Sequence, residues 1–189
     1  MSPDFLAMAR RLETTRLLLT PLEAADAERY AALIAERGPG ARNFGMTVDE
    51  VSALIAEQAI AAAASGIGFL AVRRRAVQGK GDFLGYCGLL IGRGSLDEPE
   101  VAYELLRSAH GRGYATEAAG AVIQAARATG RHRLWATVGD WNAASFRVLA
   151  KCGFRRDHTV PGVSGDLVYL VLDLAEPHRQ PENKDHRTS

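Results

Sequence analysis

The stretch HGRGYATEAA, at residues 110–119, restricts the possible folds of this chain more than any other segment. A strand-like segment at 99–106 precedes it, and apolar residues at helical spacing follow it. Glycine costs conformational entropy, so two glycines one residue apart before a helix indicate backbone that must stay bare. The first N–H groups of a helix are unpaired and lie at the positive end of its dipole. The stretch therefore predicts either an anion-binding cradle or a tight strand-to-helix turn without a ligand.

Two familiar phosphate-binding loops do not fit this spacing. A dinucleotide fingerprint that uses Gly111 and Gly113 needs a third glycine at position 116, where the chain has Thr116. A Walker loop needs Lys and then Ser or Thr after its last glycine, but Tyr114 follows Gly113. If the cradle binds phosphate, it does so in another fold.

The rest of the chain predicts strands interleaved with helices. Thr47 and Glu50 form a capping box at the start of one helix, which Gly66 ends, and Gly130 and Gly153 end two later helices. Such an order predicts one mixed sheet with helices on its faces. We expect strands at 16–20, 68–76, 82–92, 99–106, 133–139 and 167–174, and helices at 24–37, from 47, from 114 and at 143–152.

Composition narrows the class of protein. The formal net charge of +1 argues against a broad nucleic-acid surface. The N-terminus has no apolar region of a signal peptide, and the Ala-rich segment at 60–65 is too short to span a bilayer, so we expect a cytoplasmic protein without membrane contact. Cys87 and Cys152 lie among apolar residues and predict buried, reduced thiols. No group of His, Cys, Asp or Glu has metal-ligand spacing, so no metal is expected.

A family resemblance rests on an ordered set of motifs. GRGYATEA, with His110 where Gln or Arg is usual, resembles motif A of the GNAT superfamily of acetyl-CoA-dependent N-acetyltransferases. The segments at 14–33 and 141–154 (WNAASFRVLAKCGF) resemble other parts of the branch that acetylates the N-terminal amines of ribosomal proteins. The resemblance implies a single α/β domain at 10–175 with a mostly antiparallel sheet, including one more strand before the last. Residues 176–189 are expected to form a disordered polar tail.

The resemblance also implies how coenzyme A is bound. Motif A would hold the pyrophosphate, the backbone after the preceding strand would pair with the pantetheine arm, and Asn142 and Ser145 would contact the cofactor from the following helix. Asp140 or Asn142 also fits an ordinary helix N-cap, which is compatible with that role. The expected cofactor residues are Glu104, Leu105, Leu106, His110, Gly111, Arg112, Gly113, Tyr114, Ala115, Thr116, Asn142 and Ser145.

Two residues are candidates for catalysis. Glu100 matches a glutamate that is the general base in some family members, and a solvated strand-end glutamate is the alternative. Glu104 is a second candidate base, because alternation puts both on one strand face unless a bulge intervenes. Ser145 matches a serine proposed to protonate or hydrogen-bond the leaving thiolate, or it bonds only within its own helix. Leu149 stands where many members have a tyrosine acid.

The acceptor is a primary amine, either a protein N-terminal α-amine or a small molecule. We expect its binding segments at 38–46 and 158–166, with Trp141 in the pocket and Trp135 in the core. The three arginines at 73–75 either attract an acidic substrate or form a solvated strand end near a hairpin, and we expect the strand end. An alternative function is a catalytically silent domain that binds acyl-CoA as a sensor or interaction module. A homodimer is possible.

Overall fold

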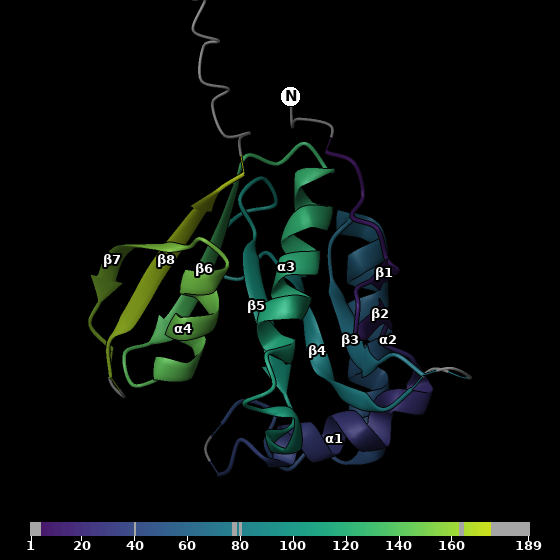
Figure 1. Cartoon of the computed structure of the whole chain (residues 1–189). Helices are drawn as coiled ribbons and strands as arrows, with labels where there is room; N and C mark the ends of the chain where they lie inside the picture. The colour runs from purple at the N-terminus through teal and green to yellow at the C-terminus, as the bar shows by residue number, and fades with distance from the viewer. Residues whose placement is uncertain (1–4, 40, 77–78, 80, 163–164, 175–189) are drawn as a thin grey trace, which may run out of the picture.

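One sheet with the strand order β1-β2-β3-β4-β5-β6-β8-β7 forms the frame of the computed structural model, which describes residues 5–39, 41–76, 79, 81–162 and 165–174 (Figure 1). Adjacent strands are antiparallel except β5 and β6, which are parallel. The strands are β1 (Leu12–Glu13), β2 (Leu17–Pro21), β3 (Phe69–Arg74), β4 (Phe83–Leu90), β5 (Glu100–Leu105), β6 (Arg133–Gly139), β7 (Arg155–Val160) and β8 (Leu167–Asp173). The helices are α1 (Ala27–Ala35), α2 (Val48–Ser65), α3 (Tyr114–Arg127) and α4 (Ala143–Lys151), with short 3-10 turns at Ala24–Asp26 and Arg107–Ala109.

The predicted helix boundaries are confirmed where local chemistry sets them. At the start of α2, the Thr47 backbone N–H donates to Glu50 Oε2 over 2.7 Å, and the Glu50 N–H donates to Thr47 Oγ1 over 3.3 Å. This is the expected capping box, and Gly66 ends the helix in the left-handed region with a φ of +72°. Gly130 and Gly153 also have positive φ, at +84° and +89°. A residue with a β-carbon is strained in this region, so glycine is favoured at these helix ends.

Other predicted boundaries were wrong. The helix expected at 24–37 is a 3-10 turn followed by α1, which ends at Ala35. Strand β1 was not predicted, and β7 occupies residues that we expected to bind the acceptor, from 158 to 160. The predicted tail at 176–189 lies outside the described residues, as does part of the turn between β3 and β4.

Helices cover the two faces of the sheet unequally. Helix α3 lies over β4 and β5, and α4 lies over β6 and β8 (Figure 1). They enclose the larger apolar cluster, which includes Ala118, Val122, Leu134 and Leu149. Helices α1 and α2 pack on the opposite face against β3 and β4, where a second cluster includes Ala71 and Phe83. Over the described residues, no helix covers that second face at β6, β8 and β7, because α1 and α2 contact the other half of the sheet.

Both cysteines are free thiols, in agreement with the sequence prediction. Cys87 is fully buried and Cys152 is half-buried. Burial raises the pKa of both thiols, so both are protonated at neutral pH.

The arginine segment was predicted wrongly at its first residue. Arg73 is buried and forms an ion pair with Asp26, which is 4% exposed. Arg74 and Arg75 are exposed and pair with Asp82 and Glu13. The segment is therefore a solvated strand end only at its last two residues.

Strands β5 and β6 separate after a single aligned pair. Glu100 is aligned with Trp135, and the Trp135 N–H donates to the Pro99 carbonyl over 2.9 Å. The register between β4 and β5 is continuous from Leu90 and Glu100 onward, so β5 carries no bulge. Backbone groups of β5 on the side of β6 are consequently left without a strand partner beyond this pair.

Candidate functional site

A cleft of about 520 Å³ opens where β5 and β6 separate. We call it the larger cleft. Ten of the twelve predicted cofactor residues line it, which are Glu104, Leu105, His110, Gly111, Gly113, Tyr114, Ala115, Thr116, Asn142 and Ser145. Tyr103, Ala109, Ala144, Arg147, Val148 and Lys151 also line it and were not predicted.

The other two predicted cofactor residues do not line the larger cleft. Leu106 packs against the second apolar cluster, and its N–H donates to the Leu84 carbonyl over 2.8 Å. The Arg112 carbonyl accepts a hydrogen bond from Arg16 Nη1 over 2.9 Å, and its side chain is exposed. Both were assigned from their position in the motif, which does not show where each group points.

The Gly-Arg-Gly turn has the geometry of a cradle. Gly111 and Gly113 have φ values of +73° and +79°, which favour glycine. A β-carbon on Gly111 would meet no other atom within 4 Å. Gly113 is the N-cap of α3 and offers no side chain to the first N–H groups of the helix. These donors therefore stay available to an anion in the larger cleft. The two readings of the sequence are compatible, because the tight turn is what exposes the donors.

An ion-pair network fixes the outer side of this turn. Arg16 Nε donates to Glu117 Oε2 over 2.7 Å, and its guanidinium lies 4.7 Å from the centre of the Tyr114 ring. The Thr14 hydroxyl donates to Glu117 Oε1 over 2.5 Å. Partial burial raises the pKa of the Glu117 carboxyl, but hydrogen bonds from Thr14 and Arg16 outweigh that effect and lower it. Glu117, part of the ATEAA sequence, thus joins the start of β2 to the cradle, a role that the sequence analysis missed.

His110 makes a contact within the protein. Its Nε2 lies 2.8 Å from the Leu105 carbonyl oxygen, which can only accept, so Nε2 carries the proton in this contact. The imidazole therefore bonds the end of β5 at the edge of the larger cleft. Because the N–H of Leu106 and the carbonyl of Leu105 are already paired, a bound ligand would find fewer free backbone groups here than we expected.

Helix α4 forms the opposite wall. The Asn142 side chain accepts from the Ser145 N–H over 3.1 Å, so Asn142 is the N-cap, and Asp140 is not. The Ser145 side chain lines the cleft and lies within hydrogen-bonding reach of the Tyr103 phenol. Arg147 and Lys151 lie one helical turn apart along the same wall, where they add positive charge. Their spacing on a helix next to Asn142 and Ser145 was the sequence signal that could have revealed them.

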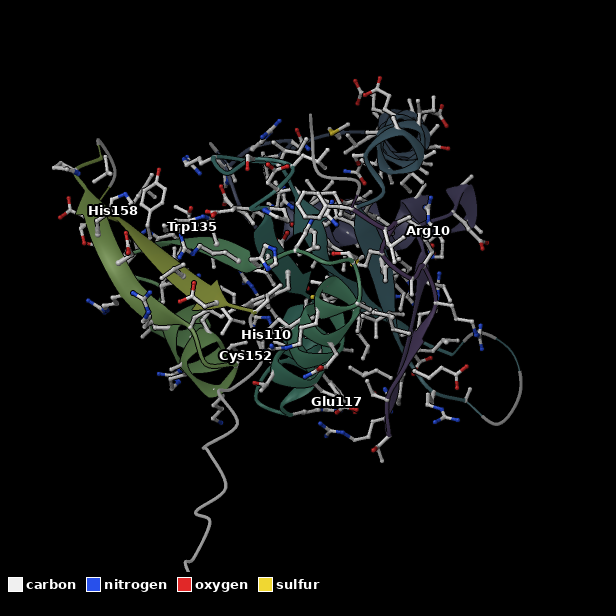
Figure 2. All side chains as sticks on the ribbon, turned by 90° about the horizontal axis from the view of Figure 1, so that it is seen from above. Arg10, His110, Glu117, Trp135, Cys152 and His158 are labelled. Carbon is white, nitrogen blue, oxygen red and sulfur yellow. The ribbon has the colours of Figure 1, made fainter. Side chains whose placement is uncertain are left out.

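A smaller cleft of about 380 Å³ lies at the start of β5. Figure 2 shows its residues Trp135 and His158 on one side of the β6–β8 strands, with Cys152 of α4 on the other side. The His158 ring stacks on Tyr169 at 4.3 Å between ring centres. The cleft is lined by Arg93, Gly94, Ser95, Glu98, Glu100, Trp135, His158 and Tyr169. Among the described residues of the two segments predicted to bind the acceptor, His158 alone lines this cleft, and the loop at 93–98 that also lines it was not singled out from the sequence.

The two candidate bases have different surroundings. Glu100 is 7% exposed and lines the smaller cleft, where its Oε1 accepts from the Arg93 backbone N–H. Glu104 lies on the same face, but Arg37 Nε contacts both of its carboxylate oxygens, at 2.9 and 3.0 Å. Only Glu100 therefore has a carboxylate that faces a cleft without a cationic side chain bound to it.

Neither tryptophan lies in the surroundings that we expected. Trp135, predicted in the core, lines the smaller cleft, and its Nε1–H donates to Glu98 Oε2 over 2.8 Å. Trp141, predicted in the substrate pocket, is 74% exposed and lines neither cleft. It packs on Gly139, where an added β-carbon would lie 2.6 Å from Trp141 Nε1.

No group of three or more His, Cys, Asp or Glu side chains is arranged to hold a metal ion in the described part. Among the helices that the structure describes, none is both long and apolar enough to cross a bilayer.

Comparison with known proteins identifies relatives of this chain. Residues 16–155 match the acetyltransferase (GNAT) domain family. An acetyltransferase of the GNAT family from Bordetella pertussis is 25% identical, with a TM-score of 0.72 over 86% of this chain and 99% of its own. An acetyltransferase from Salmonella typhimurium, solved with acetyl-CoA, is 23% identical, with a TM-score of 0.67 over 88% and 98%. The ribosomal-protein-S5-alanine acetyltransferase of Vibrio fischeri shares the fold at 17% identity, with a TM-score of 0.72 over 86% and 96%. Curated protein sequences gave no match.

Proposed function

The chain belongs to the GNAT family of acetyltransferases, and we propose that it moves the acetyl group of acetyl-CoA to a primary amine held in the smaller cleft. The observation that carries this proposal is that two clefts share strand β5, the smaller one at Glu100 and the larger one at Tyr103, Glu104 and Leu105. Glu100 of the smaller cleft and Tyr103 of the larger cleft are three residues apart, or about 10 Å along a strand.

Acetyl-CoA is the acetyl donor that this family uses, and it supplies an acetyl thioester on a long arm that ends in phosphates. The larger cleft fits such a molecule. The uncapped N–H groups of α3 would bind the phosphates, and Arg147 and Lys151 would supply positive charge from the opposite wall. The unpaired edge of β5 offers backbone groups to the amides of the arm, as an added strand would use them.

We propose that Glu100 is the general base. A carbon–nitrogen bond forms as the carbon–sulfur bond breaks, the sulfur keeps the electron pair, and the amine proton passes to the Glu100 carboxylate. An α-amine has a reference pKa of about 8, whereas a lysine side chain has one of about 10.4. Near neutral pH, an α-amine therefore loses its proton more readily than a lysine side chain does, and a carboxylate base has less to contribute. Holding both reactants on one strand adds to the rate.

Ser145 is proposed to hydrogen-bond the leaving sulfur. Its side chain lines the larger cleft beside the Tyr103 phenol, and its hydroxyl can turn toward a bound ligand. Asn142 caps the helix through the Ser145 backbone N–H, so the cap does not engage the Ser145 hydroxyl.

The acceptor is proposed to be a protein N-terminal α-amine or a small-molecule amine. Similarity to ribosomal-protein acetyltransferases supports the first, although that likeness is one of fold. The aromatic side chains that line the smaller cleft support the second. Binding of the acceptor by Trp141, pairing into a homodimer and a cytoplasmic location stay predictions.

The test is release of free thiol from acetyl-CoA in the presence of a peptide with a free alanine N-terminus, or of a panel of small primary amines. We expect Glu100→Gln to lower kcat by roughly 10²- to 10⁴-fold and to leave the Kd of acetyl-CoA nearly unchanged. For an α-amine the loss should shrink as the pH rises above about 8, because the free base then forms without help.

Glu57→Gln is the matched control, because Glu57 is an exposed carboxylate on α2, away from both clefts. Full activity of Glu100→Gln would exclude Glu100 as the base. Tight binding of acetyl-CoA without thiol release, for any amine, would favour the silent acyl-CoA-binding module instead.

A further inference from the structure

The leaving thiolate lacks one common partner in this chain. Leu149 stands where many relatives have a tyrosine, and its side chain is 1% exposed within the larger apolar cluster. Helix α4 therefore supplies no phenol to the larger cleft. The Ser145 hydroxyl is the donor already assigned from that helix.

A different element brings a phenol to the same place. Tyr103 extends from β5 across the separation between β5 and β6, and its hydroxyl donates to the Ser145 carbonyl oxygen over 3.3 Å. Its side chain lines the larger cleft and packs against the apolar cluster beneath it. A distance of 3.3 Å is long for a hydrogen bond between oxygens, so this bond is weak and the hydroxyl can turn to a better acceptor.

We propose that the Tyr103 hydroxyl donates a hydrogen bond to the sulfur of coenzyme A as the carbon–sulfur bond breaks. The inference rests on the proposed function, and it adds a catalytic residue to it. In this arrangement strand β5 supplies both the base for the amine and the hydrogen-bond donor for the leaving sulfur. Glu100 receives the amine proton on one face of the strand, and Tyr103 stabilises the leaving sulfur on the other.

Tyr103 acts as a hydrogen-bond donor and keeps its proton. Burial raises the pKa of its phenol to about 12, whereas a thiol has a pKa of about 8.5. Moving the proton from phenol to thiolate would be unfavourable by roughly 3,000-fold, the equivalent of about 3.5 pKa units. The phenol therefore stays protonated near neutral pH, and the thiolate takes a proton from water after release.

Binding of free coenzyme A tests the inference without turnover. A donor at the sulfur lowers the pKa of the bound thiol, so affinity should rise with pH between the bound and the free pKa and then level off. A shift of one unit corresponds to about tenfold tighter binding across that window. Calorimetric titration between pH 6.5 and 9.5 should show this rise for the unmodified chain. Desulfo-coenzyme A, which has no sulfur, should show none.

The variants separate the two donors. We expect Tyr103→Phe to lose most of the rise with pH and to lower kcat at saturating acetyl-CoA by about 10- to 100-fold, within the range seen when a single transition-state donor is removed. Ser145→Ala should retain a clear rise. Tyr30→Phe removes a tyrosine hydroxyl from α1, outside both clefts, and should behave like the unmodified chain.

Three results would overturn the inference. The first is that Tyr103→Phe keeps both its kcat and the rise of coenzyme A affinity with pH. The second is that Ser145→Ala alone loses this rise in affinity. The third is that the unmodified chain shows no rise in affinity with pH. Thermal melting checks that Tyr103→Phe is folded. Failure of the proposed function is distinguishable, because it would appear as an absence of thiol release with every amine even when coenzyme A binding retains its pH dependence.

Discussion

Replacement of Gly113 by alanine should separate the strain of the cradle from its function. Gly113 has a φ of +79°, and a residue with a β-carbon pays roughly 1–2 kcal/mol in this region. For a domain of this size, each kcal/mol lowers Tm by about 2–4 °C, so we expect Gly113→Ala to melt about 2–8 °C lower. The added carbon would lie 3.5 Å from Arg16 Nη2, an ordinary contact, so no clash within the protein adds to that cost.

Binding should suffer separately from stability. An alanine at Gly113 disfavours the φ of +79° with which this turn leaves the first N–H groups of α3 uncapped, and we assign those groups to the phosphates of acetyl-CoA. Loss of one hydrogen bond to a charged group costs about 1.5–3 kcal/mol, which corresponds to roughly 10- to 150-fold in Kd. Calorimetric titration with acetyl-CoA measures this change directly.

Gly130→Ala provides the matched control. Gly130 has a φ of +84°, and a β-carbon there would meet no other atom within 4 Å. It follows the far end of α3, about 20 Å from the cradle by helix length. Both variants should lose similar stability, but only Gly113→Ala should lose affinity. Equal affinity in the two variants would refute the assignment of the Gly-Arg-Gly turn as an anion cradle.

Two further predictions concern the charged groups around the larger cleft. The folded-state pKa of Glu117 is lowered, so its contribution to stability is present above the unfolded pKa of 4.5 and is lost as the pH falls through the folded pKa. The Tm of the unmodified chain should therefore fall more steeply below pH 4.5 than the Tm of Glu117→Gln. Parallel Tm curves for the two proteins would show that the ion pair with Arg16 does not stabilise the fold. Arg147→Ala and Lys151→Ala should each weaken acetyl-CoA binding by roughly 1.5- to 5-fold at low salt and by less at high salt. The control variant Arg29→Ala, on α1, should bind acetyl-CoA as the unmodified chain does. Titrations at two ionic strengths measure these differences. Identical salt dependence in all four proteins would contradict a role for α4 in binding phosphate.

Local chemistry made some features readable from the sequence. The capping box of Thr47 and Glu50 and the glycines at 66, 130 and 153 act within a few residues of each other, so their effect on the backbone does not depend on the rest of the fold. The cradle is of the same kind, because its glycines, its turn and its helix are contiguous. Alternation along β5 was also predicted correctly, since it follows from strand geometry alone.

Features that depend on distant partners could not be predicted. Alternation placed Glu100 and Glu104 on one face, but only the approach of Arg37, 67 residues away from Glu104, shows which carboxylate is already bound. Trp135 was expected in the core because its strand is apolar, yet the face on which it lies carries no helix in the described part of the chain. The pairs of Asp26 with Arg73 and of Thr14 with Glu117 join residues 47 and 103 positions apart.

The division between the two kinds of feature has one physical reason. Helix caps, turns and strand alternation depend on interactions between near neighbours in the chain, which the sequence by itself determines. The separation of β5 from β6, the clefts on their two faces and the position of Tyr103 beside Ser145 depend on which elements pack together. That choice is made by burial of apolar surface over the whole chain, so only the tertiary structure decided it.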